Sequence, residues 1–93
     1  MIGDAAAGGW DAQLADVDKF KLNAEGEYVS PVCKEGNLRM CVKLENCDWW
    51  QTEFNVFDGK ILFRGKGNDQ DAVKVAAGQT VKLNFKDNTG SIQ

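Results

Sequence analysis

Short stretches in which apolar and polar residues alternate dominate this 93-residue chain. In 38–44 the apolar side chains take every second position, and Arg39, Cys41 and Lys43 stand between them. A period of two predicts a half-buried strand whose apolar face packs on a core. Comparable short runs predict further strands at 28–33, 54–56, 61–63, 73–75 and 81–85, and a last short strand after 87–90.

Turn signals separate the predicted strands. Asp58 and Gly59 both accept positive φ, so they predict a tight hairpin between two of these strands. Gly and Asn in 34–37 predict another hairpin, which would join the first predicted strand to 38–44. Helical signals are confined to 12–17, which is long enough for a turn or two. The pattern therefore predicts an all-β, immunoglobulin-like β-sandwich of two antiparallel sheets.

The composition fits a single domain over residues 1–93. Hydrophobic residues make up 43 % of the chain and charged residues 27 %, a mix that supports a packed core. The net charge of −3 and the pI near 4.8 argue against nucleic-acid binding, which needs a basic surface. No apolar run approaches the roughly eighteen residues of a membrane-spanning helix, so we expect no membrane insertion by this domain.

The residue types limit the chemistry that the chain can perform. It has no His, which excludes Ser-His-Asp and Cys-His catalysis and the usual Cys/His zinc sites. Cys33, Cys41 and Cys47 lack the CxxC spacing of metal and redox pairs, so we expect no metal and no cofactor. Three pairs of carboxylates remain as possible acid/base pairs, and their spacing of two would place each pair on one strand face: Asp16 and Asp18, Glu25 and Glu27, and Asp69 and Asp71. A solvated surface explains such pairs better than a catalytic cleft, and we expect no catalytic residue.

Three tryptophans are the strongest candidates for a binding site. Trp10 follows a glycine-rich stretch that predicts a loop, and Trp49 and Trp50 are adjacent. If 49–50 is extended, the two rings point to opposite faces, and counting from the next strand places Trp50 inward and Trp49 outward. Exposed indoles suit sugars, whose apolar faces stack on aromatic rings. Lys43 and the polar loop 64–70 offer hydrogen-bond partners for hydroxyls.

Several short motifs, taken in order, resemble the repeated domains of SusE/SusF-type lipoproteins of starch-utilisation systems. The motifs are IGDA at 2–5, GGWD at 8–11, DWW at 48–50, FDG at 57–59, RG at 64–65, DQ at 69–70, VAAGQ at 75–79 and NTG at 88–90. They span nearly the whole chain.

The resemblance implies a non-catalytic β-sandwich module that binds starch or malto-oligosaccharide. It also implies that the domain is part of a longer multi-domain lipoprotein, anchored at the outer-membrane surface of a Gram-negative bacterium, where other modules of the same complex lie nearby. Carried over by position, Trp10 and one of Trp49 or Trp50 would form the platform, and Lys43 would donate to hydroxyls. The alternative is a structural or protein-contacting spacer in which the tryptophans only seal the sandwich.

Overall fold

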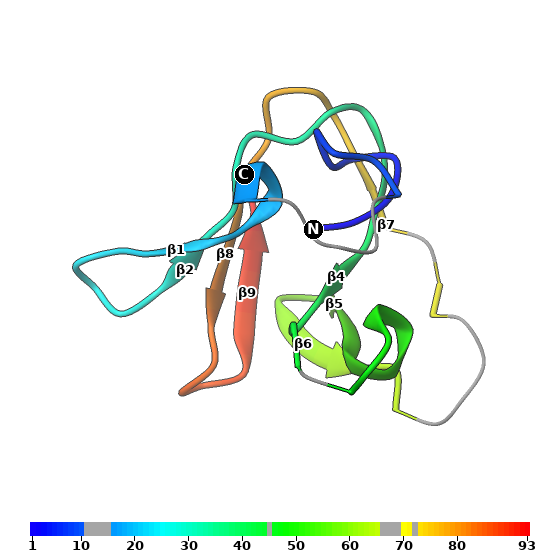
Figure 1. The fold of residues 1–93 in the computed structure, drawn as a ribbon. Helices are drawn as coiled ribbons and strands as arrows, with labels where there is room; N and C mark the ends of the chain where they lie inside the picture. Colours follow the sequence, from blue (N-terminus) through cyan, green and yellow to red (C-terminus); the bar gives the residue numbers. More distant parts are fainter. Residues whose placement is uncertain (11–15, 45, 66–69, 72) are drawn as a thin grey trace.

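The computed structural model describes residues 1–10, 16–44, 46–65, 70–71 and 73–93 (Figure 1). These residues form short strands and two single-turn 3-10 helices. The elements are η1 (Asp16–Asp18), β1 (Lys21–Leu22), β2 (Tyr28–Val29), β3 (Gly36–Leu38), β4 (Met40–Cys41), η2 (Trp49–Thr52), β5 (Glu53–Phe57), β6 (Lys60–Phe63), β7 (Val73–Val75), β8 (Val81–Asn84) and β9 (Thr89–Ile92). Neither helix in these ranges has the length or the apolar character needed to cross a bilayer.

The strands form two antiparallel sheets. The larger sheet has seven strands in the order β1-β2-β8-β9-β6-β5-β4, and β3 pairs with β7 in a smaller one. A single residue pair, Lys60 with Thr89, joins β6 to β9. The large sheet therefore consists of two groups of strands, which lie apart in Figure 1. This arrangement confirms the predicted all-β, sandwich-like fold.

The β5–β6 hairpin forms where the sequence predicts it. Asp58 and Gly59 lie at φ 52° and 79°, which is the left-handed pair that a two-residue turn of this type requires. The strands then pair in register from Phe57 with Lys60 to Phe54 with Phe63. Local turn chemistry is sufficient to specify this hairpin.

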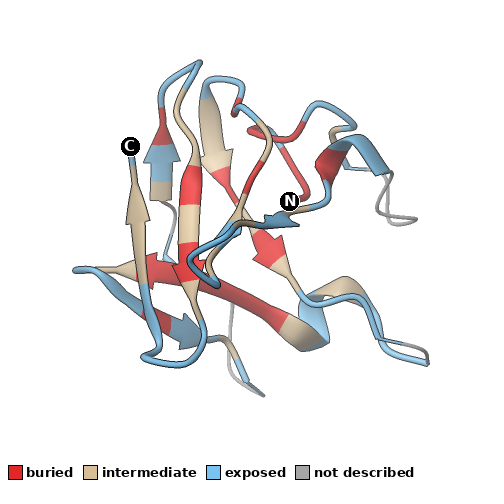
Figure 2. Cartoon of the chain, turned by 90° about the vertical axis from the view of Figure 1, so that its left-hand side faces the viewer, coloured by how far each residue is buried: buried red, intermediate tan, exposed pale blue. Residues whose placement is uncertain are grey.

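The core is formed by strands of both sheets and by the N-terminal segment, and Figure 2 shows buried stretches in the central strands. Its fully buried members include Leu38 and Met40, as the alternation predicts. Val42 and Leu44 were expected on the same face, but they are 39 % and 53 % exposed. The prediction fails there because regular pairing ends at Cys41, so the period of two no longer fixes the side chains. Buried apolar residues of the core are Met1, Ala5, Ala6, Cys33, Leu38, Met40, Phe54, Val56, Ile61, Val75, Val81 and Leu83.

The predicted hairpin at 34–37 is wrong. Strand β2 is shorter than predicted and pairs with β1 and β8, whereas β3 pairs with β7. The segment between β2 and β3 bonds to distant backbone instead: Cys33 N–H donates to Gln79 O at 2.8 Å and Lys34 N–H to Ala5 O at 2.9 Å. Long-range pairing therefore overrides the local turn signal. Of the helical signal at 12–17, positions 16 and 17 lie in η1, and 12–15 lie outside the described residues.

Candidate functional site

Trp10 is held at the surface by a compact glycine turn. Gly3 adopts φ 97°, and its N–H donates to Gly9 O at 2.8 Å, which closes the loop that carries Trp10. A Cβ at Gly3 would lie 3.3 Å from Trp10 Cζ2, so the indole lies against bare backbone. Trp10 Nε1 donates a long hydrogen bond of 3.4 Å to Asp4 Oδ1, and the side chain is 55 % exposed. The loop thus presents one side of a large ring to solvent.

Trp49 and Trp50 lie on η2 rather than on an extended strand. Asp48 N–H donates to Gln51 Oε1 at 2.7 Å, and Gln51 N–H donates to Asp48 O at 3.0 Å. These bonds close a single 3-10 turn, in which side chains do not alternate between two faces. Trp49 is half-buried, and Trp50 is 45 % exposed. The predicted inward position of Trp50 is therefore wrong, because it assumed an extended chain.

The structure brings Trp10 and Trp49 together around Arg39. Their ring centroids are 5.7 Å apart and the planes are inclined by 63°. The Cζ atom of Arg39 lies 5.4 Å from the Trp10 centroid and 5.7 Å from that of Trp49. Both distances fall within cation–π range, so one guanidinium contacts two indoles.

A buried carboxylate connects this pair to Trp50. Glu53 is 2 % exposed; its Oε2 accepts from Arg39 Nη1 and its Oε1 accepts from Arg64 Nη1, both at 3.0 Å. The Cζ atom of Arg64 lies 5.9 Å from the Trp50 ring centroid. We refer to Trp10, Trp49, Trp50, Arg39, Arg64 and Glu53 as the Trp–Arg cluster. Its arginine side chains are 25 % and 15 % exposed, so the cluster combines a fixed interior with accessible rings.

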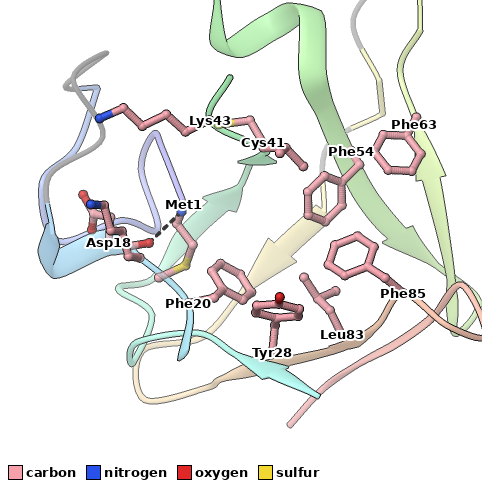
Figure 3. A pocket seen from close by; sticks show the side chains of 12 residues that line it. Met1, Asp18, Phe20, Tyr28, Cys41, Lys43, Phe54, Phe63, Leu83 and Phe85 are labelled. Carbon is pink, nitrogen blue, oxygen red and sulfur yellow. Dashed lines mark hydrogen bonds between the residues drawn. The ribbon is translucent and has the colours of Figure 1, made fainter. Parts of the chain in front are cut away.

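Lys43 lies elsewhere, on the wall of an apolar pocket of about 620 Å³. In Figure 3 its side chain points away from the ring of Phe54, and none of the described lining residues is a tryptophan. Lys43 therefore lies on the wall of this pocket, whereas the Trp–Arg cluster is built from other residues, and its role as a donor to sugar stays a prediction. The pocket is lined by Met1, Asp18, Lys19, Phe20, Tyr28, Cys41, Val42, Lys43, Phe54, Phe63, Leu83 and Phe85.

The pocket and the cluster differ in chemistry. Rings in the pocket contact one another, with centroids 5.6 Å apart for Phe54 and Phe85 and 5.8 Å apart for Tyr28 and Phe85. Burial also raises the pKa of the Cys41 thiol, which keeps the thiol neutral. Such walls suit apolar packing, whereas sugar hydroxyls need directional donors beside an aromatic face. Only the cluster places guanidinium groups against indoles among the described residues.

Sequence reasoning missed Arg39 and Glu53. Arg39 was placed on the polar face of its strand, but that face also holds Cys41 and Lys43. Which of the three meets a tryptophan depends on where the Trp10 loop docks, and Ile2 N–H fixes this by donating to Arg39 O at 3.0 Å. The local alternation of apolar and polar residues cannot predict this long-range contact.

Three carboxylates of the pairs found in the sequence, Asp16, Asp18 and Glu27, have side-chain hydrogen bonds or ion pairs in the structure. Asp16 pairs with Lys19 at 2.7 Å, and this hydrogen bond and charge lower the pKa of the Asp16 carboxyl. Asp18 accepts the Gly8 N–H at 3.1 and 3.2 Å, which ties η1 to the Trp10 loop. Asp69 lies outside the described residues.

Comparison with known proteins assigns the class. The SusF/SusE family of starch-specific carbohydrate-binding modules matches residues 1–91, and the chain belongs to this family. The outer membrane protein SusF of Bacteroides thetaiotaomicron is 48 % identical over 99 residues, which cover 100 % of this chain and 20 % of that protein. The crystal structure of SusF from Bacteroides thetaiotaomicron superposes with a TM-score of 0.91 at 46 % identity, covering 99 % of this chain and 22 % of that one. The chain thus spans about a fifth of the length of the relative it matches.

Proposed function

We propose that this chain is a non-catalytic module that binds starch and malto-oligosaccharides at the Trp–Arg cluster. The observation that carries the proposal is the inclined pair of exposed Trp10 and half-buried Trp49, with Arg39 against both rings. Membership in a family of starch-specific modules supports the ligand class.

Each part of the cluster has a distinct role in the proposed binding. The indole faces stack on the apolar faces of glucose units, and the inclination of 63° suits a curved α-glucan better than a flat β-glucan ribbon. Arg39 supplies N–H donors for glucose hydroxyls beside the rings. Trp50 and Arg64 extend the surface on the other side of Glu53. Lys43 remains a predicted donor from the sequence.

The roles of the buried carboxylates among the described residues support binding without bond cleavage. Glu53 is buried between two guanidiniums, and Asp18 accepts a backbone N–H. A glycosidase needs two carboxyl groups across an open cleft, roughly 5–9.5 Å apart, with the sugar between them. Carboxylates that are already paired inside the fold are poor candidates for the acid and base of a glycosidase.

The proposal extends to the protein that contains this module. We place that protein at the outer-membrane surface, held by a lipid anchor, with further modules of the same complex as neighbours. A shallow stacking site gives a weak Kd, on the order of 10 μM to 1 mM, because much of the sugar stays hydrated. Several modules on one glucan chain would compensate through avidity.

Intrinsic tryptophan fluorescence tests the proposal directly. We expect a saturable change on titration with maltoheptaose and none with cellohexaose, because stacking alters the surroundings of Trp10 and Trp49. No response to either sugar, with the fold intact, would favour the spacer alternative.

Trp10→Ala then tests the site. Loss of half the platform should abolish retention on insoluble starch, while circular dichroism stays native because Trp10 is 55 % exposed. Leu22→Ala is the matched control, since Leu22 is 61 % exposed on β1 at the opposite edge of the large sheet from β4. Unchanged retention by Trp10→Ala would contradict this site.

A further inference from the structure

We infer that Glu53 is a positioning residue that couples the two parts of the Trp–Arg cluster, an inference that rests on the proposed glucan site. Its carboxylate joins Arg39, which contacts Trp10 and Trp49, to Arg64, which contacts Trp50. Glu53 is 2 % exposed, so it acts on sugar only through these arginines.

The geometry gives each carboxylate oxygen one guanidinium. Oε2 bonds Arg39 and Oε1 bonds Arg64, each through Nη1 at 3.0 Å. Two bonds of this kind fix the carboxylate plane, and the plane in turn sets the direction of both guanidiniums. An arginine has a planar fork of donors, so its orientation decides whether its remaining donors reach a sugar beside the ring.

The charges make the two arginines mutually dependent. One buried negative charge holds two positive charges that otherwise repel each other. Removing one arginine leaves the carboxylate less compensated, and removing the carboxylate releases both arginines. We therefore expect a substitution of Arg64 to alter the arrangement of the Trp10–Trp49 pair through Glu53.

Asn55 provides a control for a purely structural effect. It lies two residues further along β5 and is also 2 % exposed. Its Nδ2 donates to Leu38 O at 2.8 Å, so its side chain supports the fold through backbone. Losing that bond lowers stability without changing the partners of Arg39.

The first experiment compares Glu53→Gln with Asn55→Ala by calorimetric titration with maltoheptaose and near-ultraviolet circular dichroism. The Gln amide presents N–H groups to a guanidinium, so at least one arginine must turn away. We expect about tenfold weaker binding and an altered tryptophan dichroism band in the sugar-free protein. Asn55→Ala should lower Tm and leave both readouts unchanged. Native affinity and a native dichroism band in folded Glu53→Gln would overturn the inference.

Arg64→Lys decides the matter if Glu53→Gln does not fold. Lysine keeps the charge but loses the planar fork, so we expect a change in the dichroism band and a few-fold weaker binding. Where Glu53→Gln does fold, combining it with Arg64→Lys should give less than additive effects, and full additivity would contradict the coupling. If the wild type fails to bind maltoheptaose, the proposed function fails. The tryptophan dichroism band of the sugar-free variants still tests whether Glu53 positions the rings.

Discussion

Two aromatic regions of this molecule differ in what accompanies the rings. The Trp–Arg cluster sets indoles against guanidiniums that a buried carboxylate fixes, and it opens to solvent. The pocket near Phe54 sets aromatic rings against one another, within largely apolar walls. The pocket has a volume of about 620 Å³, yet the cluster has the donors beside aromatic faces that a hydroxyl-rich ligand needs.

Phe54→Ala should break the pocket without breaking the cluster. Phe54 is 2 % exposed and contacts Phe63 and Phe85, so its loss leaves a cavity that costs about 3–5 kcal/mol of unfolding free energy. Urea denaturation measures this loss. Maltoheptaose affinity of the folded fraction should stay native, and a parallel loss would place sugar in the pocket. Phe54→Leu, which retains more volume, serves if the Ala variant does not fold.

Arg39→Ala should have the opposite outcome and break the Trp–Arg cluster without breaking the pocket. Loss of hydrogen bonds from a charged donor costs about 1.5–3 kcal/mol of binding free energy, and Trp10 and Trp49 also lose their shared contact. Calorimetry with maltoheptaose measures the change, and Arg39→Lys shows how much depends on the planar fork. Native maltoheptaose affinity in folded Arg39→Ala would show that Arg39 is not part of the sugar site.

Lys43→Ala sharpens the boundary between the regions. A donor beside the sugar would contribute about 1–2 kcal/mol, which is the value that the sequence pattern predicts. Because Lys43 lies on the pocket wall, we expect a smaller effect than that of Arg39→Ala. An equal effect would mean that the sugar extends from the cluster to the pocket rim.

The smallest expected effect is a loss of stability at alkaline pH, and it comes from two thiols. Burial raises the pKa of Cys33 and of Cys41 above the ordinary 9.0, so the unfolded chain releases these protons first. Stability should therefore fall as pH rises above 9.0, and it should not depend on these thiols at lower pH. Thermal unfolding across this range measures the slope, which the double variant Cys33→Ala/Cys41→Ala should flatten. An identical slope in that variant would contradict the assignment.

The sequence predicted elements that local interactions determine. Asp58 and Gly59 specify their hairpin by backbone preference, and alternation places Leu38 and Met40 in the core. Pairing of β3 with β7 was not predictable, because no turn joins two strands so far apart in the chain.

The same distinction explains the site. Trp10 and Trp49 were recognisable as large aromatic residues near polar groups and family motifs. The 3-10 turn of η2 was missed because counting back from the next strand assumed an extended chain at 49–50, whereas the bond between Asp48 and Gln51 closes a turn there. Arg39 and Glu53 were missed because a strand pattern gives the face of a residue and not its partner across the fold.

The loop that carries Trp10 also determines when the cluster can exist during folding. Trp10 and Trp49 are separated by 39 positions in the chain, and Arg39, which lies between β3 and β4, meets Glu53 at the start of β5. We expect the cluster to form after the β5–β6 hairpin, because closing the long loop between Trp10 and Trp49 costs more chain entropy than closing a two-residue turn. A partly folded chain with an intact hairpin would then lack the cluster. Under the proposed function, retention on starch would measure the completely folded fraction.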